Sequence, residues 1–398
     1  MEDSSRGGSS SGGLEGLEEQ LKGLSVSRRS PGKGPTYLLH AALQPAGLLA
    51  VSCSDRALHL HQRETLAPAG EYQGHTGPIC GLKFAHASPA LLYSGSADGS
   101  VRAWDVRRPG TEAVQAFSSD PAHSYLSFDL SCSDVLLCAG TEQLSNQDSF
   151  LVFWDCRKPG AGPLGVYSES HSDDITQVCF HPRDRERLAS GSADGLVNVF
   201  DLRRGAEDDA LLLTCNSDSG VGSVCWAGPD LQQLLCLGSA GGLHLWDLGR
   251  VSTDQPLALF SSGDARGAGL DYLVGGQWLE QARRLLVVGG GHRGDLHLLE
   301  CDARGLRPLS TLGGGHSSVV RCFLWDAAGG ALVTGGEDAQ LLLWKPGGTE
   351  LTPGRTESRK SQSALRVKAK PHQQHQYQKH EYQKHQDQKH EYQRGKRS

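Results

Sequence analysis

Methionine is nearly absent from this chain, occurring only as Met1, and long apolar runs are missing. No stretch of about 18 uncharged apolar residues exists, which argues against a membrane-spanning helix. The Ser/Gly-rich residues 1–13 also lack the apolar core of an export signal. The sequence therefore predicts an intracellular protein of the cytoplasm or the nucleus that is not secreted and has no membrane partner.

Paired cysteines are missing as well. The chain has 11 cysteines, an odd number, and no two of them form a C-x-x-C motif. They are scattered through apolar runs, where a reduced thiol serves as a small hydrophobic side chain. Unpaired thiols in this number favour a reducing compartment.

Basic charge is scarce over most of the sequence. The formal net charge is −6, yet residues 355–398 carry roughly eight more basic than acidic side chains. The rest of the chain is therefore distinctly acidic. Because a phosphate-binding surface needs concentrated Lys and Arg, this argues against a nucleic-acid site anywhere except in the tail.

What the sequence does contain is self-similarity. Three phrases are near copies of one another, namely SGSADGSVRAWD (94–105), SGSADGLVNVFD (190–201) and TGGEDAQLLLWK (334–345). Four weaker copies complete a set with intervals of roughly 43 to 53 residues, the length of a propeller blade with four short strands. The penultimate position of the copies falls at His61, Trp104, Trp154, Phe200, Trp246, Leu299 and Trp344.

An independent pattern lies upstream of each phrase. There, a strand with alternating apolar residues closes on a large side chain just before a polar turn. These side chains are expected to pack between neighbouring blades. They are Leu43, Phe84, Phe128, Phe180, Trp226, Trp278 and Trp325.

The repeats resemble the WD-repeat family, over roughly residues 36–346. In that family a His, a Ser or Thr, a turn Asp and a Trp form a hydrogen-bonded chain within a blade, and the resemblance implies an all-β, seven-bladed propeller with these structural networks. A buried indole N–H and imidazole each need a partner, which such a chain supplies. The matching residues are His75, Ser94, Asp98 and Trp104; His171, Ser190 and Asp194, followed by Phe200; and His316, Thr334, Asp338 and Trp344.

The same side chains could be taken for a Ser-His-Asp catalytic triad. They recur at blade spacing, however, and none of the copies lies in a strained G-x-S-x-G turn. The glycine-rich phrases VVGGGHRGD and TLGGGH also lack the G-K-[ST] ending of a phosphate loop. We therefore expect no enzyme, no catalytic residue, no metal, no cofactor and no small-molecule substrate.

The ends of the chain differ from its body. We expect a flexible segment over residues 1–30 with a short helix at 14–24, a propeller over 31–348, and a disordered basic His/Gln/Lys-rich tail over 349–398. The seventh blade lacks a fourth strand, which residues 24–27 or 364–368 would supply. The family resemblance favours 24–27. The tail is either inert or a contact for RNA or a nuclear import receptor.

The predicted function is that of a monomeric protein-interaction scaffold. Its partner protein or peptide would bind the rim loops, where Asp173, Asp174 and Glu337 lie beside Thr76, Ser172 and Ser317. As an alternative, the W-D-x-R phrases ending in Arg107 and Arg157 resemble those of WD-repeat substrate receptors that dock on the adaptor of cullin-type ubiquitin ligases. A nuclear RNA-associated scaffold acting through the basic tail is the third hypothesis.

Overall fold

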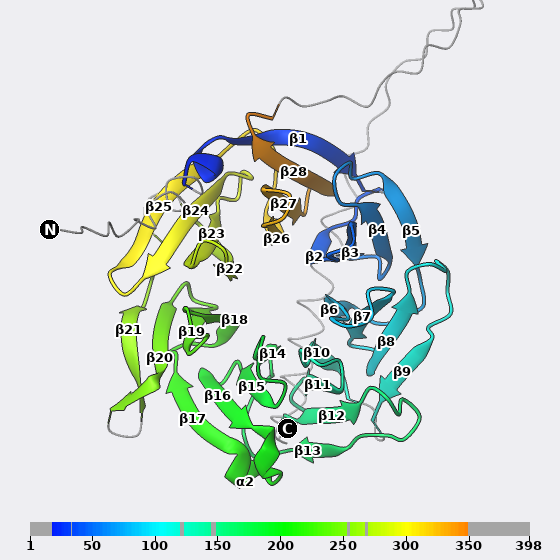
Figure 1. Cartoon of the computed structure of the whole chain (residues 1–398), viewed down its shortest axis with the longest axis vertical. Coiled ribbons are helices and arrows are strands. Elements are labelled where there is room, and N and C mark those ends of the chain that lie inside the picture. The colour runs from blue at the N-terminus through cyan, green and yellow to red at the C-terminus, as the bar shows by residue number, and fades with distance from the viewer. Residues whose placement is uncertain are drawn as a thin grey trace, which may run out of the picture. The chain divides into compact units, whose positions relative to one another are not determined.

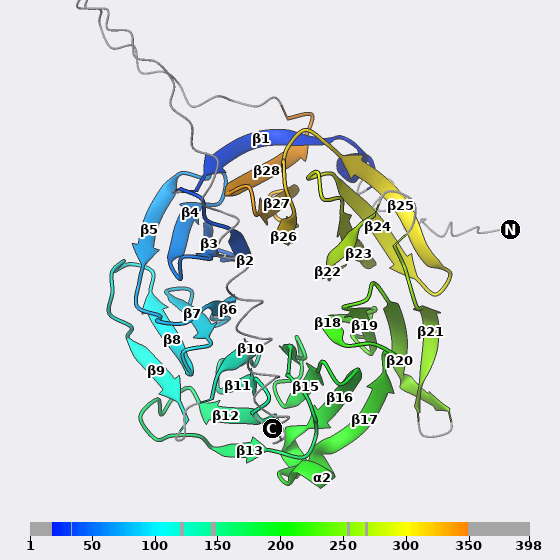
Figure 2. The same cartoon turned by 180° about the vertical axis from the view of Figure 1, so that it is seen from behind.

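The computed structural model describes residues 18–32, 34–119, 123–144, 149–252, 255–266 and 270–348. These residues form seven antiparallel sheets of four strands each, arranged in a ring (Figures 1 and 2), and the first strands of the sheets line a central channel. The predicted all-β, seven-bladed propeller is therefore confirmed. We number the blades along the chain and the strands of each blade from the channel outward.

Each of the first four blades is a meander of consecutive strands. Blade 1 consists of β2 (Leu38–Leu43), β3 (Leu48–Cys53), β4 (Leu58–Gln62) and β5 (Pro68–Tyr72). Blade 2 consists of β6 (Ile79–Phe84), β7 (Leu91–Ser96), β8 (Ser100–Asp105) and β9 (Gln115–Ser118). Blade 3 consists of β10 (Tyr125–Leu130), β11 (Leu136–Thr141), β12 (Leu151–Asp155) and β13 (Gly165–Tyr167). Blade 4 consists of β14 (Gln177–Phe180), β15 (Arg187–Gly191), β16 (Leu196–Asp201) and β17 (Leu211–Asn216).

The last blade differs from the others in taking a strand from the start of the chain. Blade 5 consists of β18 (Val221–Ala227), β19 (Gln233–Gly238), β20 (Leu243–Ser252) and β21 (Gln255–Ser262). Blade 6 consists of β22 (Tyr272–Leu279), β23 (Arg284–Gly290), β24 (Leu296–Asp302) and β25 (Gly305–Leu312). Blade 7 consists of β26 (Val320–Asp326), β27 (Ala331–Gly336), β28 (Gln340–Pro346) and β1 (Leu24–Pro31).

Helical structure is sparse among the described residues. Residues 18–22 form a short helix before β1, and the connection between β16 and β17 holds the 3₁₀ turn η1 (Leu202–Arg204) and the single-turn helix α2 (Glu207–Ala210). Within the described part of the chain, no helix has the length and apolar character needed to cross a membrane. The predicted helix over 14–24 is thus seen for 18–22, and its first turn lies outside the described residues.

The second strand of each blade explains the apolar runs of the sequence. In β7 and β27, for example, almost every residue is buried, because these strands have neighbours in their own sheet and a blade packed on each face. Close packing between blades also requires glycine. A Cβ on Gly95 of β7 would lie 2.5 Å from Cδ1 of Phe128 in the next blade.

The ring closes between the two ends of the described chain. Strand β1 pairs antiparallel with β28, from Leu24 opposite Pro346 to Pro31 opposite Gln340 (Figure 1). The N-terminal candidate for the closing strand is therefore the one used, and it is longer than the predicted 24–27. A boundary at residue 31 divides β1, so the propeller begins at Leu24. The other candidate, 364–368, lies outside the described residues.

The predicted register of the large side chains in the first strands holds in five blades and shifts in two. In blade 2, Phe84 pairs with Leu92, which pairs with Trp104. The corresponding place in blade 3 belongs to Leu130, two residues after Phe128. In blade 6 it belongs to Gly276, two residues before Trp278. There Leu235 of blade 5 fills the space that a Cβ on Gly276 would need.

Candidate interaction surface

Hydrogen-bonded chains fix one rim of blades 2 and 7. In blade 2, Trp104 Nε1 donates to Ser94 Oγ (2.8 Å), His75 Nε2 lies 2.8 Å from the same oxygen, and His75 Nδ1 lies 2.9 Å from an Asp98 carboxylate oxygen. A neutral imidazole with its proton on Nδ1 satisfies all three contacts. The predicted blade 2 residues are thus brought together.

Blade 7 repeats this arrangement with a threonine hydroxyl. Trp344 Nε1 donates to Thr334 Oγ1 (2.8 Å), and His316 Nε2 lies 2.8 Å from that oxygen. His316 Nδ1 lies 3.0 Å from Asp338 Oδ1. Burial lowers the pKa of His316 by more than the Asp338 carboxylate raises it, which favours the neutral imidazole.

In blade 4 the chain is shorter because Phe200 has no donor. His171 still joins Asp194 (3.0 Å) to Ser190 (2.7 Å). Asn198 of the third strand adds a bond from its Nδ2 to the carbonyl of Ser170 (2.7 Å). This amide is a contact that the sequence pattern did not indicate.

The geometry of these chains matches a catalytic triad, but their burial does not. Ser94 and Ser190 have no exposed surface, and Thr334 has none either. The Ser94 hydroxyl is also occupied by the indole of Trp104. A nucleophile must reach its substrate, so these chains have a structural role. They hold the turn between the second and third strands against the loop that carries the histidine.

The turn carboxylates accept several of the hydrogen bonds that fix this rim. Asp98 accepts the N–H of Thr76 (3.0 Å) as well as the N–H and O–H of Ser100 (3.0 and 2.6 Å). Burial raises the pKa of Asp98, but the hydrogen bonds from His75, Ser100 and Thr76 outweigh it and hold the pKa well below its ordinary value. The pKa of Asp194 is also lowered, because the hydrogen bonds it accepts, chiefly from His171, outweigh the effect of burial.

The candidate binding residues divide between two opposite rims. In an antiparallel four-stranded blade, the turn between the second and third strands lies at the same end as the connection to the next blade. We call this end the Asp rim, since it carries Asp98 and its counterparts. Asp173, Asp174 and Glu337 belong to the Asp rim, whereas Arg107 and Arg157 follow third strands and belong to the opposite rim.

The acidic candidates have partners within the fold. Asp174 accepts the N–H of Gln143 (2.8 Å), and Asp173 accepts the N–H of Asp174 (2.8 Å). Glu337 forms an ion pair with Arg321. All three acidic residues are half-buried, so their carboxylates shape the rim as well as charge it.

The two arginine candidates pair with the aspartate of their own W-D-x-R phrase. Arg107 donates to both oxygens of Asp105 (2.9 and 2.7 Å), and Arg157 does the same with Asp155 (2.8 Å each). The hydrogen bonds from these guanidinium groups lower the pKa of each aspartate to about 2. The W-D-x-R spacing therefore places each arginine against an aspartate of its own blade, although the arginine side chains are 74% and 68% exposed.

The channel has features that the sequence pattern did not single out. Its cavity of about 560 Å³ is lined by the first strands of all seven blades. Inside it, Lys83 Nζ lies 2.8 Å from Asp129 Oδ1, and the other oxygen of Asp129 accepts the N–H of Phe180 (2.9 Å). The ion pair joins blades 2 and 3, and the hydrogen bond from Phe180 joins blade 3 to blade 4. Its only signal in the sequence is a polar residue within an otherwise apolar strand.

These blades, with their His–Ser/Thr–Asp chains, define a WD-repeat propeller. A family profile described as "WD40: WD domain, G-beta repeat" matches residues 67–105, 162–201 and 306–345. The three matched segments are those that carry the networks of blades 2, 4 and 7. Each begins close to the start of the fourth strand of one blade and ends at or next to the last residue of the third strand of the next. The chain belongs to the WD-repeat family.

Curated relatives extend this likeness over most of the chain. The "WD repeat-containing protein GTS1" of Arabidopsis thaliana is 30% identical over 320 residues, which cover 75% of this chain and 78% of that protein. The "WD repeat-containing protein 89 homolog" of Dictyostelium discoideum is 26% identical over 323 residues, covering 79% and 84% respectively. Human "Striatin-4" is 24% identical over 294 residues, covering 71% of this chain and 38% of its own length.

Proposed function

We propose that this chain is a non-enzymatic, intracellular protein-interaction scaffold that binds a basic protein or peptide segment on the Asp rim. The observation that carries the proposal is a set of exposed carboxylates on turns that the blade structure holds in place. They include Glu169, Asp218 and Asp295, which lie on connections that the structure describes throughout. Rigid loops lose little conformational entropy when a partner binds.

The charge balance of the Asp rim supports a basic partner. Among the described residues of this rim, the exposed basic side chains, such as Arg56 and Arg293, are fewer than the exposed acidic ones. Arg266 is neutralised by Asp264, with a nitrogen-to-oxygen distance of 2.8 Å. An excess of carboxylates attracts Lys- and Arg-rich segments and disfavours acidic partners.

Charge reversal on one rim tests this proposal. Asp173→Lys combined with Asp218→Lys changes two neighbouring connections of the Asp rim, on either side of blade 4. Glu64→Lys combined with Asp230→Lys changes the net charge equally on the opposite rim, where both side chains are exposed. Proximity labelling in cells followed by mass spectrometry should show a set of partners lost with the first pair and kept with the second. Identical partner sets for both pairs would contradict the proposal.

The cullin-adaptor alternative depends on Arg107 and Arg157, which lie on the opposite rim. It requires that Arg107→Ala with Arg157→Ala reduce recovery of the ubiquitin-ligase adaptor in a pull-down, and unchanged recovery would eliminate it. The RNA or nuclear-import alternative falls on residues 349–398, outside the described residues. Truncation at Arg355 tests it through the loss of nuclear or RNA-associated proteins from the labelled set.

A further inference from the structure

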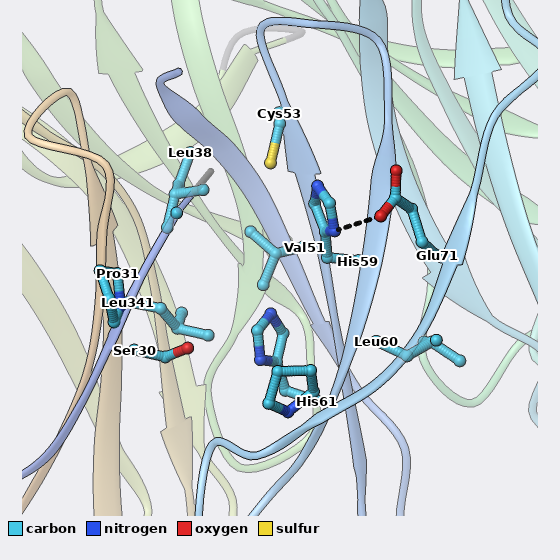
Figure 3. Close-up of a pocket in the computed structure, with 13 residues that line it drawn as sticks. Ser30, Pro31, Leu38, Val51, Cys53, His59, Leu60, His61, Glu71 and Leu341 are labelled. Atoms are coloured by element: carbon cyan, nitrogen blue, oxygen red, sulfur yellow. Dashed lines mark ion pairs between the residues drawn. The ribbon is translucent and has the colours of Figure 1, made fainter. Parts of the chain in front are cut away.

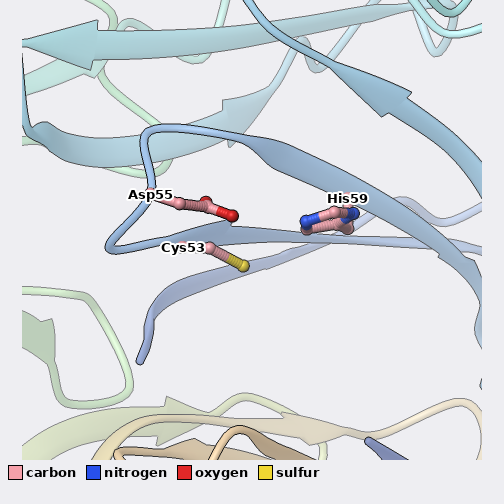
Figure 4. Close-up of side chains that lie close together, drawn as sticks. All are labelled: Cys53, Asp55 and His59. Carbon is pink, nitrogen blue, oxygen red and sulfur yellow. The ribbon is translucent and has the colours of Figure 1, made fainter. Parts of the chain in front are cut away.

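Three side chains with metal-binding atoms converge on the turn between β3 and β4 in blade 1. Cys53 ends β3, Asp55 lies in the turn and His59 lies on β4 (Figure 4). Their ligand atoms all lie within 4.8 Å of one another. In the part of the chain that the structure describes, this is the one such group of three.

Blade 1 holds this group where other blades hold a hydrogen-bonded chain. The register pairs Val51 with His59 as it pairs Ser94 with Arg102 in blade 2. Val51 therefore occupies the place of the network hydroxyl, and His61 that of the network tryptophan. The turn carboxylate Asp55 accepts the N–H of Ala57 (3.1 Å) and lies beside a thiol and an imidazole from its own hairpin.

A cavity gives access to this group. It measures about 330 Å³ and lies between blade 1 and the end of β1, with Cys53, His59 and Glu71 in its wall (Figure 3). The carboxylate of Glu71 on β5 lies 3.8 Å from Nδ1 of His59. Metal-binding histidines usually have a carboxylate or carbonyl at their other ring nitrogen, which fixes the orientation of the ring.

We propose that Cys53, His59 and Asp55 bind a divalent zinc-type ion, with Glu71 as the residue that positions His59. One thiolate, one imidazole nitrogen and one carboxylate oxygen are the donor types that Zn²⁺ prefers. Because Nδ1 faces the Glu71 carboxylate at 3.8 Å, we assign Nε2 as the metal-binding nitrogen of His59. The cavity admits water to the fourth position of a tetrahedral site.

Binding at this site exchanges a proton for the metal. The S–H bond of Cys53 breaks, a metal–sulfur bond forms, and the proton leaves to solvent. The ion itself drives this exchange, because a thiol that binds a metal does so as the thiolate. The bound ion would link β3 to β4 in a blade that lacks the His–Ser–Trp chain.

Cobalt provides a specific probe, because Co²⁺ bound to a thiolate gives sulfur-to-metal charge-transfer absorption that imidazole and carboxylate ligands alone do not give. The full-length, untagged protein is titrated with Co²⁺ under reducing conditions. The histidine-rich tail adds no thiolate and hence none of this absorption. We expect the band to saturate at one Co²⁺ per chain and to disappear when Zn²⁺ is added.

Two alanine variants assign the sulfur ligand. Cys53→Ala should abolish the charge-transfer band, whereas Cys138→Ala should retain it. Cys138 is a matched control, since it is buried and lies on the second strand of blade 3. Absence of the band in the natural chain, or its persistence in Cys53→Ala, would overturn the proposal. Circular dichroism of each variant in chelator establishes that it is folded.

Two milder variants keep the test independent of any folding defect. Asp55 is exposed, so Asp55→Asn removes a charged ligand without opening the core. Glu71→Gln removes only the positioning carboxylate, and such changes typically weaken metal binding by roughly 10- to 100-fold. Zinc affinities equal to that of the natural chain in both variants would also refute the site. None of these measurements depends on the proposed partner.

Discussion

Replacing one turn aspartate in blade 2 should destabilise the propeller far more than replacing its counterpart in blade 1. Asp98 and Asp55 occupy the same turn of neighbouring blades, and each substitution by alanine removes one negative charge. Asp98 joins His75, Thr76 and Ser100, whereas Asp55 accepts an N–H within its own turn. The pair of variants thus isolates the contribution of the hydrogen-bonded chain.

The size of the effect follows from what each donor does after the change. A hydrogen bond to a charged group contributes about 1.5–3 kcal/mol, and such contributions do not add fully. The N–H of Thr76 and the hydroxyl of Ser100 can donate to water instead. His75 is only 7% exposed and loses its Nδ1 partner inside the fold. We expect the free energy of unfolding to fall by about 3 kcal/mol in Asp98→Ala and by about 1 kcal/mol or less in Asp55→Ala.

Urea unfolding followed by tryptophan fluorescence measures both values, in chelator so that Asp55 is compared without metal. The midpoint of Asp98→Ala should fall well below that of Asp55→Ala, with similar slopes. His75→Gln in the Asp98→Ala background should then add little, because the two residues act as one unit. Equal midpoints for the two alanine variants would refute the reasoning.

Three further outcomes are expected from the natural chain and its variants. Gly95→Ala should lower stability by about 1–3 kcal/mol, because the new methyl group meets Phe128, whereas Gly165→Ala, with no atom within 4 Å, should be nearly neutral in the same urea assay. Burial lowers the pKa of His40 from 6.5 to about 4. The unfolded chain therefore takes up a proton at a higher pH than the folded chain, and stability is lost as the pH falls from 6.5 towards 4. His40→Gln should reduce the fall in the urea midpoint between about pH 7 and 4.5. Arg107→Ala with Arg157→Ala should leave the melting temperature almost unchanged, since exposed ion pairs contribute little, and a large drop would show that these pairs support the blades.

The repeat pattern was sufficient to predict the blades because every blade repeats the same packing problem. All seven penultimate positions, from His61 to Trp344, lie on third strands. The register predicted for the large side chains of the first strands was wrong in two blades. Phe128 and Trp278 are shifted by two residues, which keeps each on the same face of its strand, so alternation alone does not distinguish the two registers. What differs is the neighbouring blade, where Leu235 takes the space beside Gly276.

The candidate sites were only partly predictable. The hydrogen-bonded chains of blades 2 and 7 contain side chains whose types and spacing are distinctive. The Cys53–Asp55–His59 group is different, because its members become neighbours only when β3 and β4 pair across the turn. A search for C-x-x-C or His-rich motifs passes over it. The signal in the sequence is the hairpin register, which places Cys53 and His59 on the same face of the paired strands.

The pairing of β1 with β28 also has a consequence during synthesis. The strand made first must wait for the strand made last, over roughly 320 residues and, at about 5–20 residues per second, for about 15–65 s. During this time six blades can form while one sheet edge stays open to other chains. Mutations that weaken β1 are therefore expected to act first on yield and aggregation in the cell, before they change any property of the closed ring.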